Sequence, residues 1–182
     1  EITWDLYDVY LYGLDKPDPE AADADGVTRP SKPYVPPDRG FGHQGYPALG
    51  MTRHAAEQFC AWLSEKTGET WRLPTKAEWK HLALAGRDDR FFGVPEEALG
   101  EHAWFEDNAD FTPHPVGGKS PNAWGLHDMH GNVAEWVLWK GEAPIAVGGS
   151  YLDPLDRCTV RSAHRQSPSW QASDPQIPKS EW

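Results

Sequence analysis

Ten tryptophans share this chain of 182 residues with 17 glycines and 17 prolines. Indole rings supply large apolar surfaces for a core, whereas glycine and proline interrupt helices and strands and form turns. This combination favours a loop-rich fold that buries aromatic plates and contains few long regular elements. The length suits one domain with its own hydrophobic core, and we expect a single domain over residues 1–182.

The chain is acidic, with a formal net charge of −11 and a pI near 5.1. A surface with this excess of carboxylates is repelled by the phosphates of nucleic acids and of anionic membranes, so we expect neither as a partner. No apolar run approaches the length of a membrane-spanning segment. Carboxylates are also the ligands that calcium prefers, although a solvated acidic surface needs no metal to explain it.

Two segments carry the start and stop signals of helices. The first is expected from Thr52, whose hydroxyl suits an N-cap, to about Thr67, where Gly68 supplies a left-handed stop. The second is expected to begin within TKAE at 75–78, a pattern typical of a capping box, and to close at Gly86.

The remaining segments are predicted to be short or irregular. Residues 1–14 favour a strand that enters a short helix, and the proline-rich stretch 15–47 is expected to be a long loop. Residues 145–147 and 158–161 are candidate strands. The polar tail from residue 167 onward has no clear regular pattern.

The segment NAWGLHDMHGNVAEW at 122–136 concentrates groups that bear chemistry. Asp128 and Glu135 lie seven residues apart, and a turn through Gly131 and Asn132 separates them. Such a turn can present main-chain carbonyls between two carboxylates, which is the mixture of oxygen ligands that hard cations prefer. The alternative is a buried turn without metal, held by hydrogen bonds from the Asp and Asn side chains.

Two further groups of side chains suggest weaker hypotheses. His127 and His130 could share a transition metal, but no third ligand follows nearby. Cys158 precedes Arg161 and His164, and a thiolate beside basic groups would be a nucleophile. A lone cysteine is more often a small buried apolar residue, so both readings of Cys158 stay open.

Three segments, taken in order, resemble the formylglycine-generating enzyme (sulfatase-modifying factor) family. The first, at 55–86, contains RLPTKAEW, the second is the 122–136 segment with GNVAEW, and the third, at 147–165, begins VGGSYLD. The resemblance extends over about residues 1–165. It implies an α+β fold, a variant of the C-type lectin fold that is rich in loops and poor in regular secondary structure.

The resemblance also implies a calcium site in the second segment. In the family this turn binds calcium through two side chains and two main-chain carbonyls, which by position are those of Asp128, Gly131, Val133 and Glu135. Aspartate stands at the first position where asparagine is more usual, and it still offers an oxygen ligand. Calcium is therefore the expected cofactor.

The same resemblance argues against copper chemistry in this chain. The family's enzyme binds copper through two cysteines five residues apart, shortly after GGS. Here the second of these positions is Cys158, but the first is Asp153. Copper(I) prefers paired soft thiolates, and a carboxylate replaces one of them poorly.

A second cysteine, Cys60, falls where the family often has a cysteine bonded to one near the C-terminus of the domain. The closing strand that would carry this partner, and the strand that usually precedes the EIT of residues 1–3, are not found in this sequence. We therefore expect the sequence to be a fragment of the family's domain.

The sequence leads to two functional hypotheses. The first is a non-catalytic, calcium-stabilised binding module, an accessory subunit of a larger protein assembly outside the cytoplasm. The alternative is a divergent oxidoreductase, similar to the pyoverdine-maturation relatives, that acts on a peptide or small molecule. Its candidate site would contain Asp153, Cys158, Arg161 and His164.

Overall fold

The computed structural model describes residues 1–15, 38–89, 91, 94–141 and 143–167. The helices are α1 (Trp4–Leu11), α2 (Arg53–Thr67) and α3 (Lys76–Ala83), with 3-10 helices η2 (Glu96–Glu101) and η3 (Leu155–Arg157). The strands are β1 (Glu135–Val137), β2 (Ile145–Val147) and β3 (Ala163–Arg165). Most of the long loop and most of the tail expected from the sequence lie outside the described residues.

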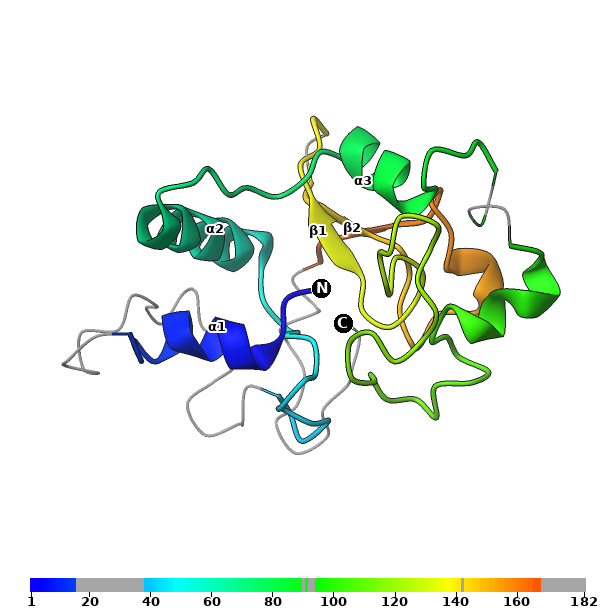
Figure 1. Ribbon diagram of the computed structural model, residues 1–182, viewed down its shortest axis with the longest axis horizontal. Coiled ribbons are helices and arrows are strands. Elements are labelled where there is room, and N and C mark those ends of the chain that lie inside the picture. The colour runs from blue at the N-terminus through cyan, green and yellow to red at the C-terminus, as the bar shows by residue number, and fades with distance from the viewer. Residues whose placement is uncertain (16–37, 90, 92–93, 142, 168–182) are drawn as a thin grey trace.

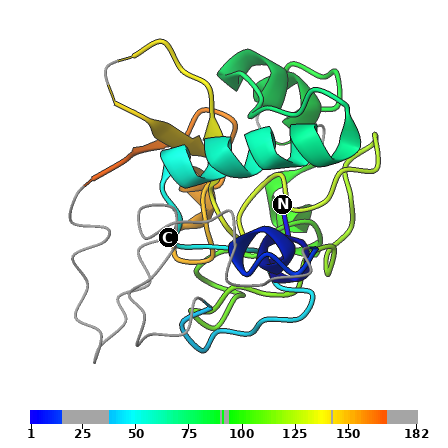
Figure 2. The same cartoon turned by 90° about the vertical axis from the view of Figure 1, so that its left-hand side faces the viewer.

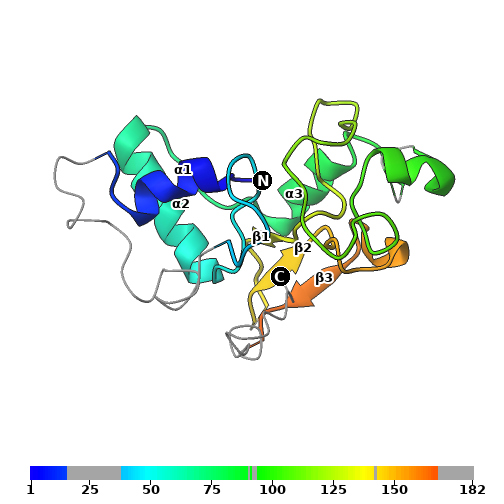
Figure 3. The same cartoon turned by 90° about the horizontal axis from the view of Figure 1, so that it is seen from below.

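Helices α1 and α2 lie side by side at one end of the molecule (Figures 1 and 3). On α1 the buried side chains include Trp4, Tyr7 and Tyr10, spaced by three residues so that they share one helical face. Their rings meet Phe59 and Trp62 of α2 in an aromatic cluster. The strand expected before α1 is limited to one bridge, between Thr3 and Pro47.

The signals that predicted α2 and α3 are confirmed in detail. The Thr52 hydroxyl accepts a hydrogen bond from Ala55 N, and Gly68 ends the helix in the left-handed region at φ 72°. Thr75 and Glu78 form the expected capping box. Helix α3 ends at Ala83, three residues before Gly86, because the chain has already left the helical conformation at Ala85, where φ is 48°.

The sheet has three short antiparallel strands in the order β1-β2-β3. Glu135 pairs with Val147, and Ala146 pairs with His164 on the other side of β2. The prediction of a strand at residues 145–147 is confirmed, and the prediction at 158–161 is wrong. There η3 and a turn precede the strand, which begins only at Ala163, since Pro154 starts a 3-10 turn instead of an extended segment.

The sheet is covered on both faces, as its alternating side chains require. Val137, Ile145 and Val147 pack against Trp79 and the other buried residues of α3. Trp136 and Ala146 point to the opposite face, where they meet Ala56 of α2. Figure 2 shows α2 passing in front of the sheet, so this second face lies between the sheet and α2.

Apart from the sheet, the described chain after α3 consists largely of turns, η2 and η3 (Figure 1). Phe91, Leu99, Ala103 and Phe105 form a separate apolar cluster there, and Cys158 lies within it. No helix among the described residues is long and apolar enough to cross a membrane. The result is the loop-rich α+β architecture that the sequence indicates.

Candidate functional site

The acidic turn that precedes β1 is built on a left-handed backbone. Asp128, Gly131 and Asn132 have φ values of 55°, 76° and 52°. At Gly131 a β-carbon would lie 1.9 Å from the carbonyl oxygen of Trp104, so only glycine fits. The next amide, that of Asn132, donates a hydrogen bond to this same oxygen over 2.8 Å. The turn is therefore fixed against the neighbouring loop.

Asp128 has one oxygen satisfied and one unsatisfied. Its Oδ2 accepts a hydrogen bond of 2.6 Å from Gly117 N, whereas the buried Oδ1 has no hydrogen-bond partner. Burial raises the pKa of this carboxyl above its usual value. An orphaned buried oxygen of this kind costs about 1–3 kcal/mol unless a further group pairs with it.

Glu135, the second carboxylate of the turn, faces two donors. Its Oε2 accepts from the indole nitrogen of Trp79 over 2.5 Å, and its Oε1 lies 3.2 Å from the main-chain nitrogen of Glu1. The side chain of Glu1 accepts from Asn132 Nδ2 and Val133 N, and burial raises the pKa of the Glu1 carboxyl.

The donor set of this turn suits a hard cation. Asp128 and Glu135 are close enough to interact electrostatically. In the described part of the chain, no donor forms a hydrogen bond with the carbonyl oxygens of Gly131 and Val133. No three His, Cys, Asp or Glu side chains of the described residues are grouped as a metal site. A cation here would therefore depend on two carboxylates, main-chain carbonyls and water.

The two histidines of the turn do not form a joint site. His130 is buried, and its Nδ1 lies 2.8 Å from the carbonyl oxygen of Cys158. Desolvation lowers the pKa of His130 to about 4. His127 instead contacts the carbonyl oxygen of Lys119 at 2.8 Å. Their separate partners do not support the transition-metal hypothesis.

Asp153 and His164 come together beside Ser150. Asp153 Oδ2 accepts hydrogen bonds from Ser150 N and Oγ at 2.9 and 2.7 Å, which closes the turn that follows β2. His164, on β3, places its Nε2 3.4 Å from the same oxygen. The side chains of two of the four residues of the candidate oxidoreductase site thus meet.

Of the other two candidate residues, Cys158 contacts the same turn, with its thiol 3.8 Å from the carbonyl oxygen of Asp153, but neither it nor Arg161 lines the pocket described next. Cys158 is fully buried in the apolar cluster, and its thiol lies 3.6 Å from the carbonyl oxygen of Ser150. Burial, followed by the charge of Asp153, raises the pKa of Cys158 to about 12. Arg161 is exposed. Neither placement supports an activated thiol at Cys158.

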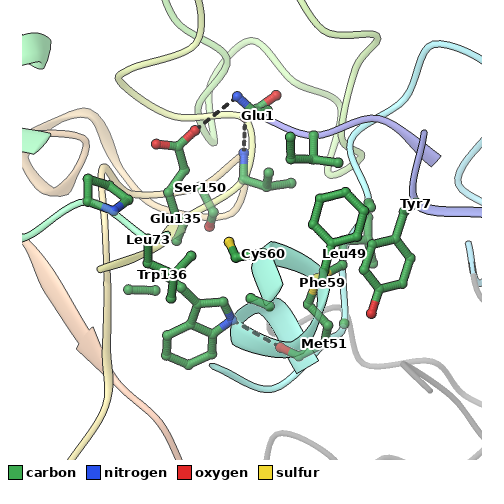
Figure 4. A pocket seen from close by; sticks show the side chains of 18 of the residues that line it. Glu1, Tyr7, Leu49, Met51, Phe59, Cys60, Leu73, Glu135, Trp136 and Ser150 are labelled. Atoms are coloured by element: carbon green, nitrogen blue, oxygen red, sulfur yellow. Dashed lines mark hydrogen bonds and ion pairs between the residues drawn. The ribbon is translucent and has the colours of Figure 1, made fainter. Parts of the chain in front are cut away.

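A pocket of about 330 Å³ lies between α2 and the sheet, and the sequence did not predict it. Its walls are mostly apolar, and Figure 4 shows Cys60 near the middle, between Trp136 on one side and Phe59 on the other. Glu135, Asp153 and His164 also line it. Burial raises the pKa of the Cys60 thiol, and the structure leaves both cysteines free. The only sequence signal for this surface is the set of apolar residues of α2 that are buried, Ala55, Ala56, Phe59 and Trp62.

These features define a loop-rich α+β domain in which an acidic turn and an apolar pocket flank a short sheet. Residues 27–175 match the FGE-sulfatase family, described as the Sulfatase-modifying factor enzyme 1-like domain. The chain belongs to the formylglycine-generating enzyme family, as its sequence motifs indicate. Its fold is accordingly the family's variant of the C-type lectin fold.

Curated relatives include serine/threonine-protein kinase pkn1 of Chlamydia pneumoniae, 36% identical over 55% of this chain and 15% of the kinase. The mouse formylglycine-generating enzyme is 31% identical over 76% of this chain and 45% of the enzyme. The chain thus spans less than half the length of these relatives.

Two solved structures share the fold. Treponema denticola variable protein 1 has a TM-score of 0.69 at 24% identity, covering 92% of this chain and 77% of that protein. PvdO from Pseudomonas aeruginosa has a TM-score of 0.61 at 29% identity, covering 68% of this chain and 57% of that one.

Proposed function

We propose that this domain is a non-catalytic member of its family, stabilised by calcium at the acidic turn, that acts by binding. The observation that carries the proposal is the environment of Asp153 and Cys158, the two positions where the family's enzyme has its copper-binding cysteines. Asp153 is engaged in closing a turn, and Cys158 is enclosed among apolar side chains. A thiol with a pKa near 12 stays protonated at neutral pH and is a poor starting point for a copper–thiolate centre.

Calcium is supported by the unsatisfied oxygens of the turn. Asp128 Oδ1 is buried without a partner, and a bound cation would supply one. Asp128 and Glu135 would hold the ion through carboxylate oxygens, and Gly131 and Val133 through main-chain oxygens. When bound, calcium would offset the repulsion between the two carboxylates and stabilise the folded state.

An accessory role within a larger assembly is supported by exposed indole rings. Trp71, Trp124 and Trp139 are each about half exposed, at 46%, 47% and 47%. Exposed tryptophans often anchor protein–protein interfaces. A location outside the cytoplasm is part of the proposal because calcium there is abundant enough to fill a site of modest affinity.

The test is elemental analysis of the protein purified in calcium-containing buffer, combined with thermal unfolding before and after chelation. We expect about one calcium per chain, no stoichiometric copper or iron, and a lower unfolding midpoint after chelation. Asp128→Ala should lose the calcium, and the exposed control Asp107→Ala should keep it. If the purified protein contains no calcium and its thermal unfolding midpoint is the same with and without chelator, the calcium site is refuted.

A divergent oxidoreductase remains the second candidate, because Asp153 and His164 line the same pocket. Its site would have to work without Cys158. Stoichiometric copper or iron in the elemental analysis, lost in His164→Ala, would favour this alternative over the binding module.

A further inference from the structure

The pocket between α2 and the sheet has an apolar body. Tyr7, Phe59, Leu73 and Trp136 contribute to its walls, and Figure 4 shows aromatic rings on two sides of the space. Its volume of about 330 Å³ lies at the lower end of the range for small-molecule sites. The space therefore suits a ligand with one ring and a short chain.

One charged group in this pocket is incompletely paired. Asp153 is 8% exposed, and all its side-chain contacts with described residues go to Oδ2: two from Ser150, with His164 Nε2 at 3.4 Å. No hydrogen bond from a described residue reaches Oδ1. Unlike Asp128 Oδ1, Asp153 Oδ1 is not cut off from solvent, so a ligand can reach it, and a largely buried carboxylate gains from a cationic or hydrogen-bonding partner.

The other charged groups that line the pocket do not supply that partner. Arg72 is engaged by both oxygens of Glu78 at 2.8 Å. Glu1 and Glu135, which also line the pocket, are acidic themselves, and the chain as a whole carries a net charge of −11. The electrostatic balance of the pocket thus favours a positive ligand.

We propose that this pocket binds a small amine, with its ammonium group on Asp153 and its apolar, preferably aromatic, body against Trp136 and Phe59. Aromatic walls suit such a ligand because they pack against its ring and attract its positive charge. The inference rests on the proposed binding function and names its ligand class. It does not depend on calcium.

The test compares three ligands of similar shape by isothermal titration calorimetry: 2-phenylethylamine, 2-phenylethanol and 3-phenylpropionate. The amine should bind more tightly than the alcohol, and the carboxylate should not bind measurably. Asp153→Asn should weaken the amine by about 30-fold, the loss expected when a buried charge loses its partner. The same substitution should change the affinity for the alcohol little, and Glu69→Gln, an exposed carboxyl outside the pocket, should change neither.

A second variant covers the chance that Asp153→Asn does not fold, since Asp153 also closes a turn. Cys60→Phe fills the pocket from α2 without touching that turn and should abolish amine binding. In the wild type, the amine should also slow alkylation of Cys60 by iodoacetamide. Equal binding of the amine and the carboxylate, or amine binding that survives Cys60→Phe, would overturn the proposal. Elemental analysis of the same samples reports the calcium content separately, so a failure of amine binding can be told apart from a failure of the calcium site.

Discussion

The indole nitrogen of Trp79 on α3 donates a hydrogen bond of 2.5 Å to Glu135 Oε2 at the start of β1. The two residues are 56 positions apart, and Trp79 is 2% exposed. The Trp79 side chain therefore packs in the core under α3 and also holds the acidic turn through its hydrogen bond to Glu135. Because the hydrogen bond orients Glu135, the packing of α3 also positions one of the two candidate calcium carboxylates.

Trp79→Phe is expected to destabilise the fold and to weaken the acidic turn. The substitution keeps an aromatic ring but removes the donor to Glu135 and part of the core volume, which should cost at least about 2 kcal/mol. Urea unfolding measures this loss. Trp139→Phe, which changes an exposed ring, should cost below about 1 kcal/mol. Equal losses in the two variants would show that the hydrogen bond to Glu135 contributes little.

Gly131→Ala is expected to prevent correct folding of the acidic turn. Its β-carbon would overlap the carbonyl oxygen of Trp104 at 1.9 Å, and backbone must move to relieve the contact. We expect a loss of about 4 kcal/mol or more in chemical unfolding. Gly125 is a matched control, because its φ of 79° is similar but its β-carbon would meet no atom within 4 Å. Gly125→Ala should cost only about 1–2 kcal/mol, and similar losses at both sites would contradict the steric argument.

His43 is expected to make stability depend on pH. Partial burial lowers the pKa of His43, but hydrogen bonds to Asp8 and Asp38, at 2.6 and 2.9 Å, raise it by more, so the net shift is upward. A raised folded-state pKa gives a stabilisation that is complete below the unfolded pKa of about 6.5 and disappears as the pH rises through the folded value.

His43→Gln should therefore destabilise the protein more at about pH 5.5 than at about pH 8.5. Urea unfolding of both proteins at each pH measures the difference. A variant whose deficit is the same at both pH values, or larger at the alkaline one, would exclude a protonated His43 between the two aspartates.

The two cysteines are expected to differ in reactivity although burial raises both pKa values. Cys60 lines the pocket, whereas Cys158 is enclosed. Iodoacetamide at about pH 7.5 should alkylate Cys60 slowly and leave Cys158 untouched until the protein is unfolded. Peptide mass mapping distinguishes the two sites. Rapid labelling of Cys158 in the folded protein would contradict this prediction and make Cys158 a candidate nucleophile again.

The local signals in the sequence were sufficient wherever neighbouring residues alone decide the structure. Thr52, Gly68 and the capping box at Thr75 act within one helical turn, so the bounds of α2 and the start of α3 were predictable. The motifs around GNVAEW identified the family, and with it the fold. The same residues indicated a turn with a carboxylate on either side.

The site required the tertiary structure because its parts come from distant segments. Asp153 meets His164 only because β3 pairs with β2, and Cys60 reaches the pocket only because α2 covers the other face of the sheet. Cys158 was open to two readings, since no local pattern sets the burial of a thiol; packing against Phe91, Leu99 and Phe105 encloses it. Sequence thus determined the family, the helix caps and the presence of two carboxylates around a turn. Long-range packing decided which of these groups share a space and how much water reaches them.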